Sequence, residues 1–339
     1  MARKAAPPKK RRRRWGAWIA LALAVVLAAF VGWMALCART VHVRRAEVAL
    51  SDLPASMDGT TLLFLSDFSL CGTNTPAQAA KLVNRLQSLH PDALLLNGDF
   101  AAPSLMDRLN GRSEADESNL APLMAALSDF RAPMGKFAVS GERDGAAESL
   151  ALRLSPGGVT LIDGQIAVLT NGTDAIGVAG VGANTKDVSA LSRQVRGAQC
   201  VIALMHSPAQ AVDVRISEAS DGGAWADLML SGHTLGGQIR LFGRTLTQLT
   251  DAEKKAVSGW RADGGAPLLT SQGLGCEGLN LRLGTQAEAW LITLRVKAEP
   301  TGMTFGPAPG GCSSWNRPEE ISRAFHVKHI NGQISKCFT

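Results

Sequence analysis

The sequence has few cysteines, and their spacing is not that of a cysteine-based site. Among 339 residues there are six cysteines, and no two of them form a CxxC pair. A dense disulfide framework, of the kind that staples small secreted domains, is therefore excluded, and no pairing can be assigned. The sequence also has no internal repeat. Because 46% of its residues are hydrophobic, the chain can bury a sizeable core in one large domain or two smaller ones.

Net positive charge is absent outside the N-terminus. The first 14 residues carry eight Lys and Arg, whereas the net charge of the whole chain is +6, so the remainder carries −2. The basic character of the chain is thus a property of its N-terminal tail. Beside an apolar segment, such a tail orients a helix and contacts anionic lipid, which makes a nucleic-acid partner the weaker interpretation.

Charge is absent altogether over residues 15–38. A helix of this length reaches about 36 Å, more than the apolar thickness of a bilayer. The segment therefore predicts a transmembrane anchor, and the basic residues before it predict a cytoplasmic N-terminus with the main domain outside the cytoplasm. A cleaved signal peptide and a lipoprotein signal at Cys37 are the alternatives. The first usually has a shorter apolar region, and the second would need a small residue where Leu36 stands.

From residue 61 onward, short apolar runs alternate with helix-like segments, which indicates an α/β protein. Several of the runs are rich in Val, Leu and Ile, as is typical of strands covered on both faces. We expect a basic tail over 1–14, the anchor over 15–38, a juxtamembrane linker over 39–60, the main domain over 61–298 and an irregular tail over 299–339.

Polar residues gather where the predicted strands end. Asp67, Asp99 and Asp144 follow three apolar runs, and His206 and His233 follow two more. Open α/β sheets build their sites at the carboxyl ends of their strands. Each residue alone has an ordinary interpretation, as a turn cap or a satisfied polar group. Five such elements in this order predict a single site.

These motifs resemble those of the calcineurin-like metallophosphoesterases, and most of all their membrane-anchored bacterial branch, over residues 62–294. The most specific part is the Gly-His-Thr-x-Gly-Gly-Gln block at 232–238. The resemblance implies a four-layer α/β/β/α sandwich with two divalent metal ions, typically Mn, Fe or Zn. It also implies hydrolysis of a phosphoester, either a phosphodiester or a phosphomonoester, by a metal-activated water.

Four positions depart from the family pattern. Ser69 stands in place of the histidine of the Asp-x-His motif, and Leu235 in place of the second histidine of Gly-His-x-His. The Gly-Asn-His-Asp motif reads Gly141-Glu142-Arg143-Asp144, so the metal-binding amide and the catalytic histidine are both replaced. These replacements fall mainly on one of the two metal sites.

The resemblance implies metal ligands at Asp67, Asp99, Glu142, His206 and His233. The first metal site keeps only Asp67 and Asp99, whereas the second keeps Asp99, His206 and His233, with Glu142 as a carboxylate in place of an amide. Two imidazoles with two carboxylates suit Zn, Fe or Mn. We therefore expect one bound ion rather than two. An alternative for Glu142 is a solvated turn residue.

Arg143 and Asp144 occupy the catalytic motif. A guanidinium can bind phosphate with two hydrogen bonds but cannot act as a general acid near neutral pH. Arg143 is therefore either a phosphate clamp or one half of a salt bridge to Asp144 or Glu142.

Two functions remain open. One is a weakened or altered phosphoesterase acting on a substrate of unknown identity, a class that includes lipid-linked phosphoesters. The other is an inactive relative that serves as a binding or interaction module at the membrane surface. Membrane lipid is the other partner expected, and no nucleic acid.

Overall fold

The computed structural model describes residues 10–71, 74–103, 106, 109–111, 120–242, 244–262, 265–297 and 328–329. Of the predicted basic tail over 1–14, only 10–14 are described, and they are the first turns of a helix. The predicted tail over 299–339 lies outside the described residues apart from a two-residue strand, β15 (Lys328–His329).

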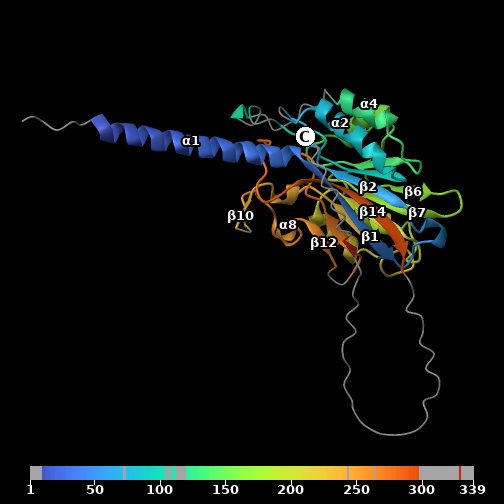
Figure 1. Cartoon of the computed structure of the whole chain (residues 1–339). Helices are drawn as coiled ribbons and strands as arrows, with labels where there is room; N and C mark the ends of the chain where they lie inside the picture. The colour runs from blue at the N-terminus through green and yellow to red at the C-terminus, as the bar shows by residue number, and fades with distance from the viewer. Residues whose placement is uncertain are drawn as a thin grey trace, which may run out of the picture.

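A long helix, α1 (Lys10–Arg39), projects from the domain (Figure 1). Its segment Trp15–Arg39 has a mean hydropathy of 2.6 and is long and apolar enough to cross a membrane. Met34 and Ala38, near its end, are buried against the domain, whereas most side chains before them are exposed. The predicted anchor is thus an apolar helix whose last turns alone contact the folded domain.

The segment predicted as a linker over 39–60 is part of the domain, so that boundary is wrong. It forms strand β1 (Val41–Leu50) and a short 3-10 helix, η1 (Ala55–Met57). β1 pairs with β14 (Ala287–Val296) along its whole length. Its first half is charged and exposed, and only Ala46, Val48 and Leu50 alternate into the core. The charged half hides the strand pattern in the sequence.

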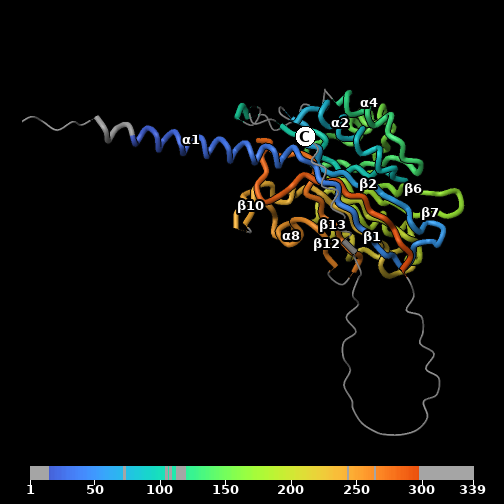
Figure 2. Tube along the Cα trace, viewed as in Figure 1, coloured from blue at the N-terminus to red at the C-terminus, as the bar shows by residue number. Residues whose placement is uncertain are grey.

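Two mixed sheets form the centre of the domain (Figure 2). Sheet one has the order β15-β1-β14-β2-β3-β4-β5, and sheet two has the order β12-β13-β9-β8-β7-β6, while β10 and β11 form a separate hairpin. The remaining strands are β2 (Thr61–Ser66), β3 (Ala93–Asn97), β4 (Lys136–Val139), β5 (Thr160–Leu161), β6 (Ile166–Thr170), β7 (Ala175–Val181), β8 (Val201–Met205), β9 (Leu228–Ser231), β10 (Arg240–Leu241), β11 (Arg244–Thr245), β12 (Gly259–Arg261) and β13 (Leu268–Thr270).

Helices cover the outer face of each sheet. α2 (Pro76–Leu86), α4 (Ala121–Asp129) and α5 (Ala147–Leu154) pack on sheet one, and α6 (Val188–Ser192) and α7 (Ala211–Ile216) pack on sheet two. The other described helices are short, namely α8 (Asp251–Lys255), η2 (Gln87–Leu89), η4 (Ser155–Gly157), η5 (Pro208–Gln210) and η6 (Leu235–Gly237). The predicted four-layer α/β/β/α sandwich is confirmed.

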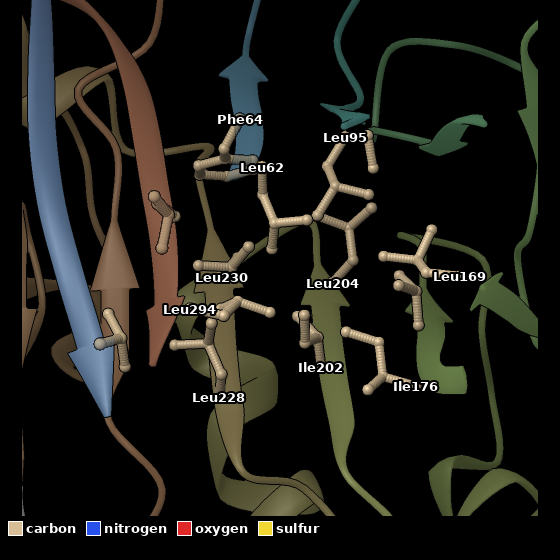
Figure 3. Packing of buried hydrophobic residues seen from close by; sticks show 14 of the residues in the cluster. Leu62, Phe64, Leu95, Leu169, Ile176, Ile202, Leu204, Leu228, Leu230 and Leu294 are labelled. Atoms are coloured by element: carbon tan, nitrogen blue, oxygen red, sulfur yellow. The ribbon is translucent and has the colours of Figure 1, made fainter. Parts of the chain in front are cut away.

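The core between the sheets explains the continuous apolar runs of the sequence. Leu62, Phe64 and Leu95 of sheet one face Ile202 and Leu230 of sheet two (Figure 3). Alternate residues of the same strands point outward onto the helices. Because both faces of the central strands are buried, nearly every position in them is apolar. This packing fixes the strand ends, from which the polar residues project.

Candidate metal centre

The site lies where β2, β3, β8 and β9 end. Asp67 directly follows β2, and Asp99 follows β3 after one glycine. The two loops are joined by a hydrogen bond of 2.8 Å from Ser69 N to the Asp99 carbonyl. His206 and His233 come from sheet two, so the site joins the edges of both sheets. The fold thus brings together the polar residues that follow these four strands.

Three of the predicted ligands form a compact cluster. One oxygen of Asp99 and one ring nitrogen each of His206 and His233 lie within 4.8 Å of one another. His233 Nδ1 is 3.1 Å from His206 Nε2, which is 3.8 Å from Asp99 Oδ1. Two nitrogens bound to one tetrahedral Zn²⁺ at about 2.05 Å would be about 3.3 Å apart. The two imidazoles are thus already spaced as ligands of one ion.

The protonation of the histidines also suits a cation. Burial lowers the pKa of His206 to about 4, so the ring is neutral at pH 7 and keeps a lone pair. Its Nδ1 is buried without a hydrogen-bond partner. The Nε2 atom of His233 lies 3.3 Å from Glu253 Oε1. A proton held there leaves the Nδ1 lone pair of His233 facing His206. These residues fit one divalent ion.

Asp67 lies beside the cluster and is held by the backbone. Both of its carboxylate oxygens accept a hydrogen bond from His233 N, each at 3.0 Å. Burial, followed by the charge of Asp99, raises the pKa of Asp67 well above its usual range. A Cβ atom at Gly232 would collide with the Asp67 carboxylate, which explains the glycine of the Gly-His motif.

Arg143 supplies the positive charge of the site. Its Nη1 binds Asp99 Oδ2, and its Nη2 binds Glu277 Oε1. Its backbone N–H also donates to Asp99 Oδ1, at 3.1 Å. Burial acts to raise the pKa of Asp99, but the pKa is lowered on balance by the neighbouring positive charge, to which Arg143 contributes. The salt bridge predicted with Asp144 or Glu142 is therefore made with Asp99 and Glu277 instead.

The other two residues of this motif lie outside the cluster. Asp144 is buried, and its carboxylate accepts backbone hydrogen bonds from Asp99 N at 2.7 Å, Phe100 N at 2.8 Å and Gly141 N at 2.7 Å. This arrangement makes it a positioning residue for the Asp99 loop. Glu142 is exposed and is not among the clustered ligands.

The backbone has the same unusual conformation at the Asp and His positions of the motifs that follow β2, β3 and β9. Five non-glycine residues have positive φ there: Asp67 (51°), Ser69 (44°), Asp99 (48°), His233 (69°) and Leu235 (51°). Such conformations are disfavoured for residues with a Cβ and persist where the surrounding structure imposes them. Ser69 and Leu235 are both buried. The chain thus keeps the local backbone at two positions whose side chains cannot provide an imidazole.

Comparison with known proteins agrees with the fold and motifs. The chain is 26% identical over 217 residues to an uncharacterized metallophosphoesterase of Aquifex aeolicus, a match that spans 61% of this chain and 74% of that protein. The chain is thus similar to a metallophosphoesterase in sequence. No family model matches it.

Two solved structures also align with the present chain. A phosphopantetheinyl hydrolase from Mycobacterium tuberculosis aligns over 66% of this chain and 91% of its own, with 15% identity and a TM-score of 0.34. A dimetal phosphatase from Danio rerio aligns over 70% of this chain and 99% of its own, with 11% identity and a TM-score of 0.38.

The structure also places near the site residues that the sequence did not indicate. Glu253 contacts His233 and lies in α8. Thr250 and Glu253 form the capping box that starts this helix, and this pattern is visible in the sequence. Glu277 comes from the loop after β13 and carries no signal of its own. Arg282 is fully buried and donates to five backbone carbonyls of the site loops. It has no motif and could not have been identified from the sequence.

Proposed function

We propose that the chain is a membrane-anchored phosphoesterase with one divalent ion, Mn, Fe or Zn, and with Arg143 in place of the second cation. The observation that carries the proposal is the sharing of Asp99. One of its oxygens belongs to the cluster with His206 and His233, and the other binds the guanidinium of Arg143. Two neighbouring positive charges on one carboxylate are the electrostatic pattern that a phosphoryl group requires.

Different residues would bind the ion and the phosphate group. Asp99, His206 and His233 would hold the ion, which when bound lowers the pKa of a water and polarises a phosphoryl oxygen. Arg143, whose side chain is 21% exposed, offers its remaining N–H groups to phosphate oxygens. Because it cannot donate a proton to a leaving group near neutral pH, a general-acid contribution of about 10²- to 10⁴-fold is missing. Slow hydrolysis is the consequence.

A second candidate is a binding module without catalysis. The observation in its favour is that Arg143 is already paired on both sides, with Asp99 and Glu277. Leu235, only 3% exposed, occupies a position that would otherwise carry a ligand of the first metal. Such a protein would bind a phosphoester without turning it over.

Elemental analysis and an activity assay on the same purified chain separate the two candidates. We expect one equivalent of a transition metal and slow metal-dependent hydrolysis of bis-p-nitrophenyl phosphate. His233→Ala should lose both, whereas His42→Ala, which changes an exposed histidine of β1, should lose neither. Bound metal without turnover would favour the binding module. Absence of metal, or two equivalents, would contradict the assigned ligand set.

The membrane topology is part of the proposal. The support is the length and hydropathy of Trp15–Arg39 and the basic residues that precede it. We propose a single-pass protein with its N-terminus in the cytoplasm and its domain outside. Protease added to intact spheroplasts should then digest the domain. Digestion only after lysis would reverse the orientation.

A further inference from the structure

The candidate site lies at the end of the domain from which α1 leaves. β1 begins at Val41, with one residue between it and the end of α1, and it is parallel to β14, with Val41 opposite Ala287. β14 is antiparallel to β2, with Trp290 opposite Phe64. The start of β1 and the end of β2 therefore lie at the same end of sheet one, measured along the strands. Asp67 follows β2 at this end of the sheet, so the site and α1 lie at the same end of the domain.

A loop beside the site also contacts the helix directly. The backbone N–H of Arg282 donates to the carbonyl of Met34 at 3.2 Å. Met34 precedes the helix end at Arg39 by five residues, or about 7.5 Å along the axis. The next loop residue, Leu283, pairs with Ile239 at the base of the β10–β11 hairpin. The base of this hairpin thus lies level with the apolar part of α1, as the position of β10 in Figure 1 shows.

The hairpin carries an apolar tip, which we define as Leu241 and Phe242. Phe242 is 97% exposed and Leu241 49%. At the base of the hairpin, Leu246, whose N–H donates to the Ile239 carbonyl at 3.0 Å, is 71% exposed. A phenylalanine so fully exposed to water is unusual for a soluble surface, and apolar residues close to one another mark contact sites. Arg240 and Arg244 flank the tip in sequence. Aromatic and aliphatic side chains next to arginines are typical of segments that lie in a membrane interface.

We propose that the apolar tip inserts into the bilayer leaflet that α1 enters, an inference that rests on the membrane anchor proposed above. The arginines would meet anionic headgroups while the tip enters the acyl boundary. The hairpin is tied to the site, because Thr245 Oγ1 and Thr247 Oγ1 both donate to the carbonyl of Gly237, at 2.9 and 3.1 Å. Gly237 lies four residues after His233 in the same loop. Two attachments, α1 and the tip, thus hold the site opening against the headgroups, and the site takes phosphoesters presented there.

Photocrosslinking of the full chain in lipid nanodiscs tests the proposal. The nanodiscs contain phosphatidylglycerol and phosphatidylethanolamine, and p-benzoylphenylalanine replaces one residue at a time. The test position is Phe242, and Phe30 within α1 is the positive control. Val168 of β6 is the matched negative control, because it is 59% exposed and β6 lies away from α1 (Figure 1). We expect lipid adducts by mass spectrometry at 242 and 30, and none above background at 168.

Each other outcome overturns a specific statement. Lipid adducts at Phe30 without adducts at Phe242 would overturn the tip insertion and leave the anchor intact. The absence of lipid adducts at both Phe30 and Phe242 would overturn the membrane anchor itself. Adducts from Phe242 to a second copy of the chain would assign the tip to a protein interface instead.

Discussion

Replacing Arg143 by glutamine should turn the site into a stronger binder of divalent cations and destabilise the metal-free chain. Asp99 is 1% exposed, and the guanidinium is its direct counterion. Breaking a buried ion pair by removing one partner costs about 3–5 kcal/mol. Because the Arg143 side chain is 21% exposed, solvent screens part of this cost, and we expect a loss of about 3 kcal/mol in the free energy of unfolding. For a domain of this size, this corresponds to a Tm lower by about 6–12 °C.

The assay is thermal unfolding in detergent, followed by tryptophan fluorescence, with EDTA or with 1 mM Mn²⁺. A site with a Kd of about 10 μM would gain about 2.7 kcal/mol at this concentration, so Mn²⁺ should restore most of the loss. The matched control is Arg193→Gln, which removes an exposed pair with Asp187 at 3.7 Å and should cost less than about 1 kcal/mol. If Arg143→Gln behaves like this control, or if Mn²⁺ raises the Tm of the native chain by the same amount, Arg143 does not act as the second cation.

Three further predictions concern groups around or away from the site. Glu253→Gln should weaken metal binding about 10- to 100-fold through the loss of its contact with His233, measured by titration with Zn²⁺; an unchanged Kd would show that the contact is incidental. Arg282→Met should lower the free energy of unfolding by at least about 3 kcal/mol, because five carbonyls lose their donor, and a urea midpoint equal to the native one would contradict this. Burial raises the pKa of Asp227 from its usual 3.8 to about 7, so the folded state holds a proton that the unfolded state has lost, and stability should fall by up to about 1.4 kcal/mol per pH unit between pH 4 and 7. Asp227→Asn should flatten this part of the stability profile, and a profile identical to that of the native chain would exclude Asp227 as the cause.

The sequence was most informative where both faces of a strand are buried. β2, β3 and β8 appear as uninterrupted apolar runs, and the polar residue at the end of each run belongs to the site. α2 begins with a capping box of Thr75 and Gln78 and with Pro76 in its first turn, a helix start that is visible in the sequence. These features depend on neighbouring residues, which a single sequence displays.

Features that depend on distant residues could not be predicted. The partner of Arg143, Glu277, is 134 residues away, and no local pattern relates them. Glu142 follows Gly141 in the expected motif, but the direction of its side chain is set by the turn, and it is exposed. β1 and α8 were missed because half of β1 is charged and α8 has only five residues.

The positive φ angles at the site have a consequence for how easily this chain could change. Each such residue raises the free energy of the folded chain by about 1 kcal/mol or more, and Ser69 and Leu235 retain this strain without providing a metal ligand. A two-metal centre would therefore require new side chains on loops whose backbone already has the positive φ angles of the other motif positions. Histidines at 69 and 235, with asparagine at 142 and histidine at 143, would enter a preformed backbone. The departure from the two-metal pattern thus resides in four side chains and not in the fold.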